Sequence, residues 1–339
     1  MTRVTTPCRL HFGLLHVPTL ENAHWPNEPA LPIRRFGGVG MMIDSERHEL
    51  TLTVHAANEW SAVGPSADRA LGFAKRVVEA SPESCRTPLQ IVVENCPPEH
   101  TGLGVGTQLG LAVARAVTTE LWGWEVPAVQ LATMVGRGER SGIGVHGFAH
   151  GGFIVDAGKT GTSGIGQIIS RTDFPNWPIV LIQPCLAANW FGDREQQVFA
   201  RPRDHIESIQ LTEKMCRLVL LGMLPALHEG DCRTFGEALY EYNRAAGEPF
   251  ILDQDGIYAS PQAKAIVKCV RDAGVTGVGQ SSWGPTLFAI CEDIEQAQSL
   301  KARLDRHFPN TCDEPFAIAN YHGARVGWRD QSQKSNHAD

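Results

Sequence analysis

The residues of this chain best suited to hold an anion lie in a glycine-rich stretch, residues 98–109. The stretch follows an apolar run typical of a β-strand and precedes a helical pattern. Helix N-termini present backbone N–H groups that have no intrahelical partner, and they attract negative charge. Gly102, Gly104 and Gly106 would let the main chain approach a phosphate closely with positive φ, and Thr107 could cap the helix. The stretch predicts a site for a phosphorylated small molecule.

The glycine spacing separates this loop from two widespread phosphate-binding loops. Its G-x-G-x-G pattern is not the G-x-G-x-x-G of dinucleotide-binding folds, and no acidic residue ends a strand about 20 residues later. The tripeptide Gly158-Lys159-Thr160 also misses the G-x-x-x-x-G-K-[ST] pattern, because Phe153 stands where the first glycine would be. A structural turn before a helix remains the alternative for the glycines taken alone.

A second group of chemically capable residues lies in the stretch from Arg137 to the glycine pair that follows His150. Arg137 and Arg140 can each make paired hydrogen bonds to a phosphate or carboxylate, and Ser141 follows directly. His146 and His150 have the four-residue spacing of two metal ligands on a helix. The many glycines make a regular helix doubtful, so an acid/base or substrate-orienting role fits these histidines better. A solvated loop is the alternative.

Two further groups of residues are candidates for the site mainly because the first two groups already indicate one. Gln280, Ser281 and Ser282 offer an amide and two hydroxyls within a glycine-rich loop, which could contact an anion or a sugar. A structural turn is the alternative there. Arg9 and His11 lie in a short apolar strand near the N-terminus, where a single histidine is more often a core or surface residue than a catalytic one.

Composition excludes several classes of protein. A net charge of −7 argues against a general nucleic-acid binder, which needs a basic surface. No apolar run is long enough to span a membrane, and the first residues do not form a signal peptide. The nine cysteines show no C-x-x-C pair, which predicts reduced thiols in a cytoplasmic protein without a structural zinc site.

Hydrophobic periodicity predicts an α+β fold of two domains, residues 1–170 and 171–329, followed by a disordered polar tail, 330–339. The expected strands span residues 8–13, 38–43, 48–54, 89–94, 151–156, 179–182, 286–290 and 316–319. The expected helices span residues 66–80, 107–121, 127–136, 207–228, 231–245, 260–273 and 293–307. The last helix and its two flanking strands read as a β-α-β unit.

Three segments, residues 7–13, 101–107 and 277–284, resemble in order the three motifs of the GHMP kinase superfamily. The resemblance runs over nearly the whole chain. It implies an N-terminal domain like domain 2 of ribosomal protein S5, joined to a ferredoxin-like C-terminal domain. The kinases usually carry G-L-G-S-S-A where this chain has residues 102–107, and some carry a catalytic Asp where it has only the glycine stretch after Arg140. ATP-dependent phosphorylation of a small alcohol is therefore the alternative function, not the first.

A narrower branch matches more residues. The segments 106–108, 140–144, 150–156 and 279–285 look like those of the β-ribofuranosylaminobenzene 5′-phosphate synthases (β-RFAP synthases), although Val105 stands where a small polar residue is expected. This resemblance implies a decarboxylating phosphoribosyl transferase of tetrahydromethanopterin biosynthesis. Such an enzyme joins phosphoribosyl pyrophosphate to 4-aminobenzoate or 4-hydroxybenzoate and releases CO2 and pyrophosphate. A kinase fold used only for ligand sensing is a third alternative.

Residues and resemblance together define a predicted site with two anion-binding regions, as a substrate with two phosphorylated ends requires. We expect catalytic roles for His150, His146 and Arg140. We expect substrate or phosphate contacts from Gly102, Gly104, Gly106, Thr107, Gln108, Arg137, Ser141, Arg9, His11, Gln280, Ser281 and Ser282. Mg²⁺ is expected on the diphosphate of the substrate rather than at a protein metal site. We expect no organic cofactor, nucleic-acid partner or membrane association, and we expect a homodimer. The sequence leaves open which histidine acts.

Overall fold

A computed structural model describes residues 1–16, 34–160, 164–184, 205–251, 256–282, 284–312 and 315–328. The expected disordered tail, 330–339, lies outside the described residues. So do most of residues 18–36, for which four prolines and the absence of a clear hydrophobic period predict a long loop.

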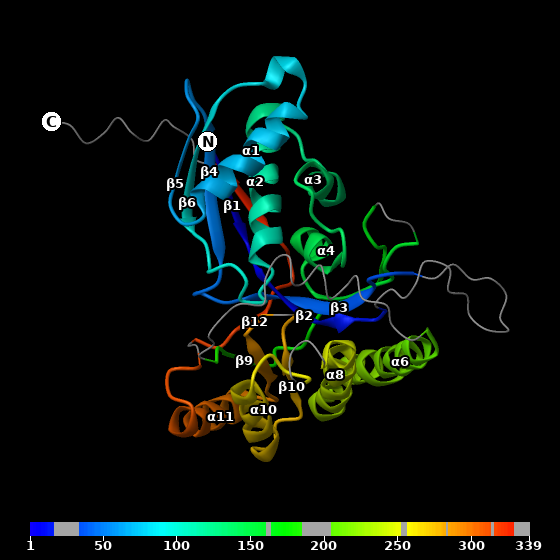
Figure 1. Ribbon diagram of the computed structural model, residues 1–339. Helices are drawn as coiled ribbons and strands as arrows, with labels where there is room; N and C mark the ends of the chain where they lie inside the picture. The colour runs from blue at the N-terminus through cyan, green and yellow to red at the C-terminus, as the bar shows by residue number, and fades with distance from the viewer. Residues whose placement is uncertain are drawn as a thin grey trace.

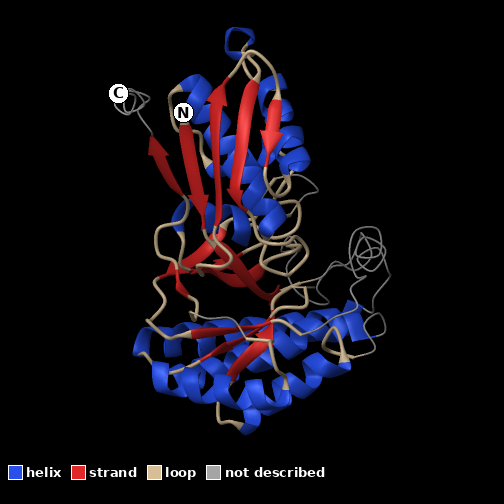
Figure 2. Ribbon diagram, turned by 90° about the vertical axis from the view of Figure 1, so that its left-hand side faces the viewer, coloured by secondary structure: helices blue, strands red, loops and turns tan. Residues whose placement is uncertain are grey.

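The first layer is a five-stranded sheet with helices packed on one face (Figures 1 and 2). Its order is β13-β1-β4-β6-β5, formed by β1 (Thr2–Thr6), β4 (Leu50–Ala56), β5 (Ser61–Val63), β6 (Leu89–Asn95) and β13 (Arg325–Trp328). Helices α1 (Ala67–Glu79) and α2 (Val105–Trp122) contact the sheet. Leu50, Leu52 and Val54 alternate with Thr51 and Thr53 along β4, which is the period-two pattern of a strand, and all five residues are buried.

A second sheet lies between this layer and the C-terminal part (Figure 1). Its strands are β2 (Cys8–Leu14), β3 (Gly38–Asp44), β7 (Phe153–Asp156), β8 (Ile168–Thr172) and β12 (Ile318–Ala319). They run β12-β3-β7-β8, and β2 also pairs with β3. Helix α4 (Ile143–His150) packs on β3, and α3 (Ala128–Met134) packs on α4.

The C-terminal part is a three-stranded antiparallel sheet with a layer of helices (Figure 2). The sheet order is β10-β11-β9, from β9 (Ile179–Ile182), β10 (Gly277–Gln280) and β11 (Leu287–Ile290). The helical segments are α6 (His205–Leu218), a π-helical turn (Val219–Met223), α7 (Leu224–Glu229), α8 (Cys232–Gly247), α10 (Pro261–Asp272) and α11 (Ile294–His307), with a short 3₁₀ turn at Glu248–Phe250. Another 3₁₀ turn, Glu83–Cys85, lies between α1 and β6 of the first layer. Asp231, Ser260 and Asp293 each cap a helix N-terminus through the side chain.

Most of the predicted elements are present, and the α+β class is confirmed. The strand–helix–strand order expected at the end of the chain is present as β11, α11 and β12, although β12 pairs with β3 of the second sheet. Ala317 and Cys312, just before β12, each bridge to β9 of the C-terminal sheet. The last strand, β13, pairs with β1 and so belongs to the N-terminal sheet, although it lies within the residues expected to form the C-terminal domain. The expected boundary near residue 170 falls inside β8, which pairs with β7. Long-range strand pairing of this kind leaves no local signal in the sequence.

Aromatic side chains join the two parts of the molecule. Phe12 on β2 lies 6.2 Å from Phe153 of the second sheet and 5.0 Å from Phe288 of the C-terminal sheet, between ring centroids. Phe153 in turn packs edge-on against Phe235 of α8, at 5.9 Å. Because these rings are buried and mutually in contact, the strand that carries Phe12 is held firmly at the junction.

Two expectations from composition can be compared with the described part of the chain. None of its helices is long and apolar enough to cross a membrane. Its eight cysteines are free thiols, as their scattered spacing predicts. Burial raises the pKa of the thiols of Cys96 and Cys216, so these two favour the protonated form.

Candidate active site

Strand β2 brings Arg9 and His11 to the junction between the two parts of the molecule. Its pairing with β3 shifts register between His11 and Gly13, which marks a β-bulge. Gly13 has a φ of 149°, and a Cβ at this position would collide with the Cβ of Ala246 on α8. Glycine is therefore required for α8 to approach β2 this closely, and α8 can then supply one side of the site.

Hydrogen bonds join the three motifs that are distant in the sequence. The backbone N–H of Arg9 donates to the carbonyl of Leu103 at 3.0 Å. The Ser281 hydroxyl accepts from the N–H of His11 at 3.1 Å and donates to the carbonyl of Gly102 at 2.8 Å. Ser281 is completely buried, so its hydroxyl fixes β2, the glycine loop and the loop after β10 relative to one another.

The glycine loop takes the conformation that its sequence predicts at two of its three glycines. Gly102 and Gly104 have φ values of 91° and 73°, in the left-handed region that favours glycine. A Cβ on Gly104 would lie 3.0 Å from Nε of Arg9, so the Arg9 side chain lies directly against the loop. The start of α2 and a guanidinium group are thus adjacent.

The predicted cap of α2 is wrong. The helix begins at Val105 with Gly104 in the N-cap position, and no side chain caps it. Thr107 therefore lies in the first turn, and its side chain lines the pocket described below. Gly106 does not have positive φ, and a Cβ there would lie 2.9 Å from Nη2 of Arg69, the end of a flexible side chain that can move aside.

The segment between α3 and α4 contributes Arg137, Glu139, Arg140 and Ser141 to the pocket. Together with Arg9 they form one wall, which we call the cationic wall because three of its five residues are arginines. The Arg137 guanidinium carbon lies 5.2 Å from the centroid of the Phe73 ring, in cation–π geometry. Burial, followed by the repulsion of neighbouring arginines, lowers the pKa of Arg137. An anion bound here would relieve this repulsion, because it would bring negative charge among excess positive charge.

The end of the same segment is attached to a buried carboxylate. Asp156, the last residue of β7, accepts the N–H of Gly142 at 2.5 Å and the N–H of Gly158 at 2.7 Å. The Ser141 hydroxyl lies 3.4 Å from the same carboxylate. Burial raises the pKa of Asp156, although these hydrogen bonds oppose the shift.

The C-terminal part supplies the opposite wall. Asn243 on α8 is buried and donates to the carbonyl of Phe12 at 2.8 Å and to that of Gln280 at 2.9 Å. Ala246, Phe250 and Ile257 follow and present apolar surface. Most of this wall comes from a helix end and the residues after it, and Gln280 at the end of β10 completes it.

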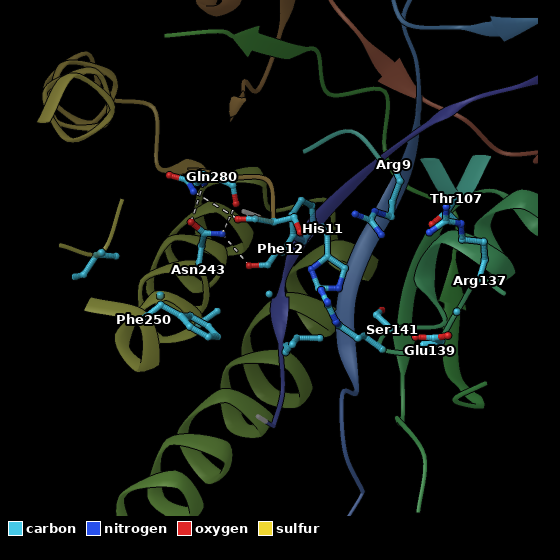
Figure 3. A pocket seen from close by; sticks show the side chains of 18 of the residues that line it. Arg9, His11, Phe12, Thr107, Arg137, Glu139, Ser141, Asn243, Phe250 and Gln280 are labelled. Carbon is cyan, nitrogen blue, oxygen red and sulfur yellow. Dashed lines mark hydrogen bonds between the residues drawn. The ribbon is translucent and has the colours of Figure 1, made fainter. Parts of the chain in front are cut away.

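These walls enclose a cavity of about 320 Å³. Figure 3 shows Asn243, Phe250 and Gln280 on one side of it and Arg9, Arg137 and Glu139 on the other. The volume is within the range of small-ligand sites. Positive charge on one side and apolar surface on the other would suit a molecule with an anionic end and an aromatic or apolar end.

His11 lies between the two walls (Figure 3). Only 4% of its surface is exposed, and its Nε2 has no hydrogen-bond partner among the described residues. Burial, followed by the charge of Arg9, lowers the pKa of His11 well below its usual value, so the ring is neutral at neutral pH. A buried polar atom of this kind is costly without a partner, and a ligand in the cavity could relieve that cost.

The pocket unites eight of the predicted site residues. These are Arg9, His11, Thr107, Arg137, Arg140, Ser141, Gln280 and Ser282. Gly104 lies beneath Arg9, so the glycine loop and the arginine segment lie on the same side of the molecule. The spatial arrangement is the one that two neighbouring anion-binding regions require, while the role of each residue stays a prediction.

Two predicted contact residues serve the fold instead of lining the pocket. Gln108 is buried; its Oε1 accepts from the Thr6 hydroxyl at 2.6 Å and its Nε2 donates to the carbonyl of Gly144 at 2.9 Å. Ser281 makes the two bonds described above. Their polar atoms are engaged within the protein, which leaves little capacity for a substrate.

The two histidines expected to be catalytic also lie away from the pocket walls. His146 is buried, and its Nε2 lies 2.6 Å from the carbonyl oxygen of Gly166. His150 is exposed at the end of α4. The helix forms despite its glycines. One of them, Gly147, lies against Met42, where a side chain would collide. Their positions give no support to catalysis in this pocket.

Comparisons with known proteins agree with the motifs. A family model described as "GHMP kinases N terminal domain" matches residues 68–152, and one described as "GHMP kinases C terminal" matches residues 223–310. A "Beta-ribofuranosylphenol 5'-phosphate synthase" of Methanothermobacter thermautotrophicus is 30% identical over 86% of this chain and 88% of its own length. The protein of the same name from Archaeoglobus fulgidus is 31% identical with the same coverage.

The chain belongs to this synthase family, within the GHMP kinase superfamily. The family expected from the motifs is thereby confirmed. Solved structures agree on the fold. Homoserine kinase from Cytophaga hutchinsonii superimposes with a TM-score of 0.66 at 14% identity, over 96% of this chain and 97% of the kinase. Mevalonate diphosphate decarboxylase from Enterococcus faecalis gives a TM-score of 0.63 at 14% identity, over 96% and 98%.

The pocket also contains residues that the sequence analysis does not single out. Glu139 stands in the same stretch as Arg137 and Arg140, but a carboxylate does not suit an anion site, so the sequence does not predict it there. Asn243, Phe250 and Ile257 belong to no motif. A buried asparagine inside a predicted helix was the one signal available for Asn243, because a buried amide must find partners.

The pocket offers limited protein ligation for a metal ion. Among the described residues that line it, Glu139 alone has a carboxylate, and no group of three His, Cys, Asp or Glu side chains that could hold a metal occurs among the described residues. A Mg²⁺ ion that arrives with a diphosphate needs few protein ligands, so this donor set fits such an ion.

Proposed function

We propose that this protein joins phosphoribosyl pyrophosphate to a para-substituted benzoate, with release of pyrophosphate and CO2. The observation that carries the proposal is a single pocket with a cationic wall facing an apolar one. The relatives are named for a ribofuranosylphenol product, and a phenol retains the para hydroxyl of its precursor. That name favours 4-hydroxybenzoate over 4-aminobenzoate. The proposed setting is tetrahydromethanopterin biosynthesis in the cytoplasm.

The cationic wall suits the sugar phosphate. Arg9, Arg137 and Arg140 can give charge-assisted hydrogen bonds to phosphate oxygens, and the start of α2 adds backbone N–H groups beside Arg9. Two phosphorylated ends could thus be held by neighbouring groups. Mg²⁺ bound to the diphosphate would add positive charge next to the leaving group, and Glu139 could contribute a ligand.

The apolar wall suits the aromatic acid. A benzoate ring could lie against Phe250 and Ile257 while its polar ends face the opposite wall. Placing the ring here would bring the carbon that bears its carboxylate towards the anomeric carbon of the ribose. Holding both reactants in one cavity lowers the entropic part of the barrier.

The bonds made and broken balance without a redox partner. The anomeric C–O bond to pyrophosphate breaks and leaves an oxocarbenium-like centre, and donors aimed at the departing diphosphate stabilise that charge. The ring carbon attacks the anomeric carbon with electron donation from its para group. The bond to the carboxylate then breaks, CO2 leaves, and its electron pair restores the aromatic ring.

His11 is the histidine that the pocket contains. As a neutral imidazole it could accept a proton from the para group, or hold the carboxylate by a hydrogen bond. Either role would satisfy a ring nitrogen that has no partner among the described residues. This position is the reason to prefer it over His146 and His150.

The test is a product analysis by mass spectrometry after incubation with phosphoribosyl pyrophosphate and each benzoate. The proposal predicts a ribosylated phenol or aniline phosphate that lacks the carboxylate. Formation of ADP with ATP and a small alcohol, without that product, would support the kinase alternative. Tight ligand binding without turnover of either pair would support ligand sensing.

A further inference from the structure

Asp156 has a buried carboxylate that the proposed reaction does not use. None of its surface is exposed, and it does not line the pocket. Its Oδ2 accepts the N–H of Gly142 and its Oδ1 accepts the N–H of Gly158. An ionised carboxylate only accepts hydrogen bonds, so both oxygens match these donors.

The Gly142 contact fixes one end of the segment that carries the cationic wall. At the other end, the N–H of Arg137 donates to the carbonyl of Ala132 on α3 at 2.8 Å. Ser141, the last pocket residue of the segment, also has its hydroxyl 3.4 Å from the carboxylate. The segment that carries Arg137 and Arg140 is therefore held at one end by α3 and at the other by the Asp156 side chain.

The carboxylate is confined from its other side as well. A Cβ on Gly166 would collide with Oδ1 of Asp156, so the main chain at Gly166 lies directly against it. The carbonyl oxygen of Gly166 lies 2.6 Å from Nε2 of His146. His146 thus holds a segment of chain against Asp156, and the carboxylate has one position available.

We propose that Asp156 is a positioning residue for anion binding, which acts through Gly142 and Ser141 on the placement of Arg140. Only the identity of the anion, a sugar diphosphate, rests on the proposed function. His146 holds the main chain at Gly166 against the Asp156 carboxylate, so its role in this proposal is structural rather than catalytic.

The first test is binding of inorganic pyrophosphate to Asp156→Asn by calorimetry. An asparagine must direct its NH₂ group at one of two N–H donors, so the segment would have to move. We expect at least a tenfold weaker affinity, with the KM for the aromatic acid unchanged. Asp305 on α11 is half-buried, pairs with Lys301 and lies outside the pocket, so Asp305→Asn is the matched control and should leave the affinity unchanged.

A double-mutant cycle separates positioning from general damage. If Asp156 acts through Arg140, the loss caused by Asp156→Asn in an Arg140→Ala background should be less than a third of the loss in the wild-type background. A larger remaining loss overturns the proposal. No loss in the wild-type background overturns it too.

Folding and the proposed function are controlled separately. If Asp156→Asn does not fold, Gly166→Ala displaces the same carboxylate from the opposite side and should weaken pyrophosphate binding in the same way; unchanged affinity in folded Gly166→Ala overturns the proposal. Wild-type protein that binds pyrophosphate but does not consume phosphoribosyl pyrophosphate contradicts the proposed function and leaves this test valid. Wild-type protein that binds no pyrophosphate contradicts both.

Discussion

The two walls of the pocket differ in how the chain builds them. The cationic wall comes from short segments in which neighbouring residues, such as Arg137 and Arg140, act together. The apolar wall comes from Asn243, Phe250 and Ile257, which are spread along a helix end and the chain beyond it. The first kind of wall can be read as a motif. The second becomes visible only when the fold brings its residues together.

The largest expected effect is on the cationic wall. Arg140→Ala should weaken binding of phosphoribosyl pyrophosphate by at least about 1.5 kcal/mol, the scale of a hydrogen bond to a charged group. The affinity for the aromatic acid should change little. Calorimetry of the two ligands measures both effects, and Arg306→Ala, an exposed arginine on α11, is the control. Unchanged affinity would remove Arg140 from the site.

A smaller effect is expected on the apolar wall. Phe250→Leu keeps an apolar side chain but loses the flat ring, which should cost about 1 kcal/mol of aromatic-acid binding. Steady-state kinetics should then show a KM for the benzoate raised about fivefold and an unchanged KM for phosphoribosyl pyrophosphate. Leu221→Ala, at a side chain 75% exposed, is the control. A rise in both KM values would mean that the walls do not bind separate parts of the substrates.

His11 lies between the two walls, and it should make the free energy of unfolding fall as the pH is lowered. Its pKa is lowered in the folded protein, so the unfolded chain takes up a proton more readily. The contribution of His11 to the free energy of unfolding is fully present above the ordinary pKa of histidine, about 6.5. It is lost as the pH falls below that value towards the pKa of the folded protein. Urea denaturation should show a steeper loss for wild type than for His11→Gln, by at most about 1.4 kcal/mol per pH unit. His228→Gln, an exposed histidine, should keep the wild-type slope; equal slopes for wild type and His11→Gln contradict the assignment.

The smallest effect is expected outside both walls. His150 is exposed at the end of α4, so His150→Gln should leave kcat within about twofold of wild type, in keeping with most surface substitutions. A large fall in kcat with normal binding would restore the catalytic role that its sequence suggested. It would also show that the pocket extends beyond the residues described.

Local chemistry explains why much of the fold and of the cationic wall could be predicted. Gly102 and Gly104 adopt the conformations that their residue type permits, and Leu50, Leu52 and Val54 form the strand that their alternation indicates. The three motifs, taken in their order along the chain, also predicted the family and the overall fold.

Tertiary contacts explain where prediction failed. Thr107 has the right residue type for a helix cap, but α2 starts two residues earlier, where Gly104 ends the loop beneath Arg9. Glycines made a helix at α4 doubtful, yet Gly147 is needed there because Met42 lies against it. A propensity is a weak guide where packing decides.

The most direct measurement is the release of labelled CO2 from carboxyl-labelled 4-hydroxybenzoate, followed together with pyrophosphate. We expect the label to leave only when phosphoribosyl pyrophosphate is present, one CO2 for each pyrophosphate, with no need for ATP. Pyrophosphate release with the carboxylate retained, or no release of either, would contradict the proposed reaction.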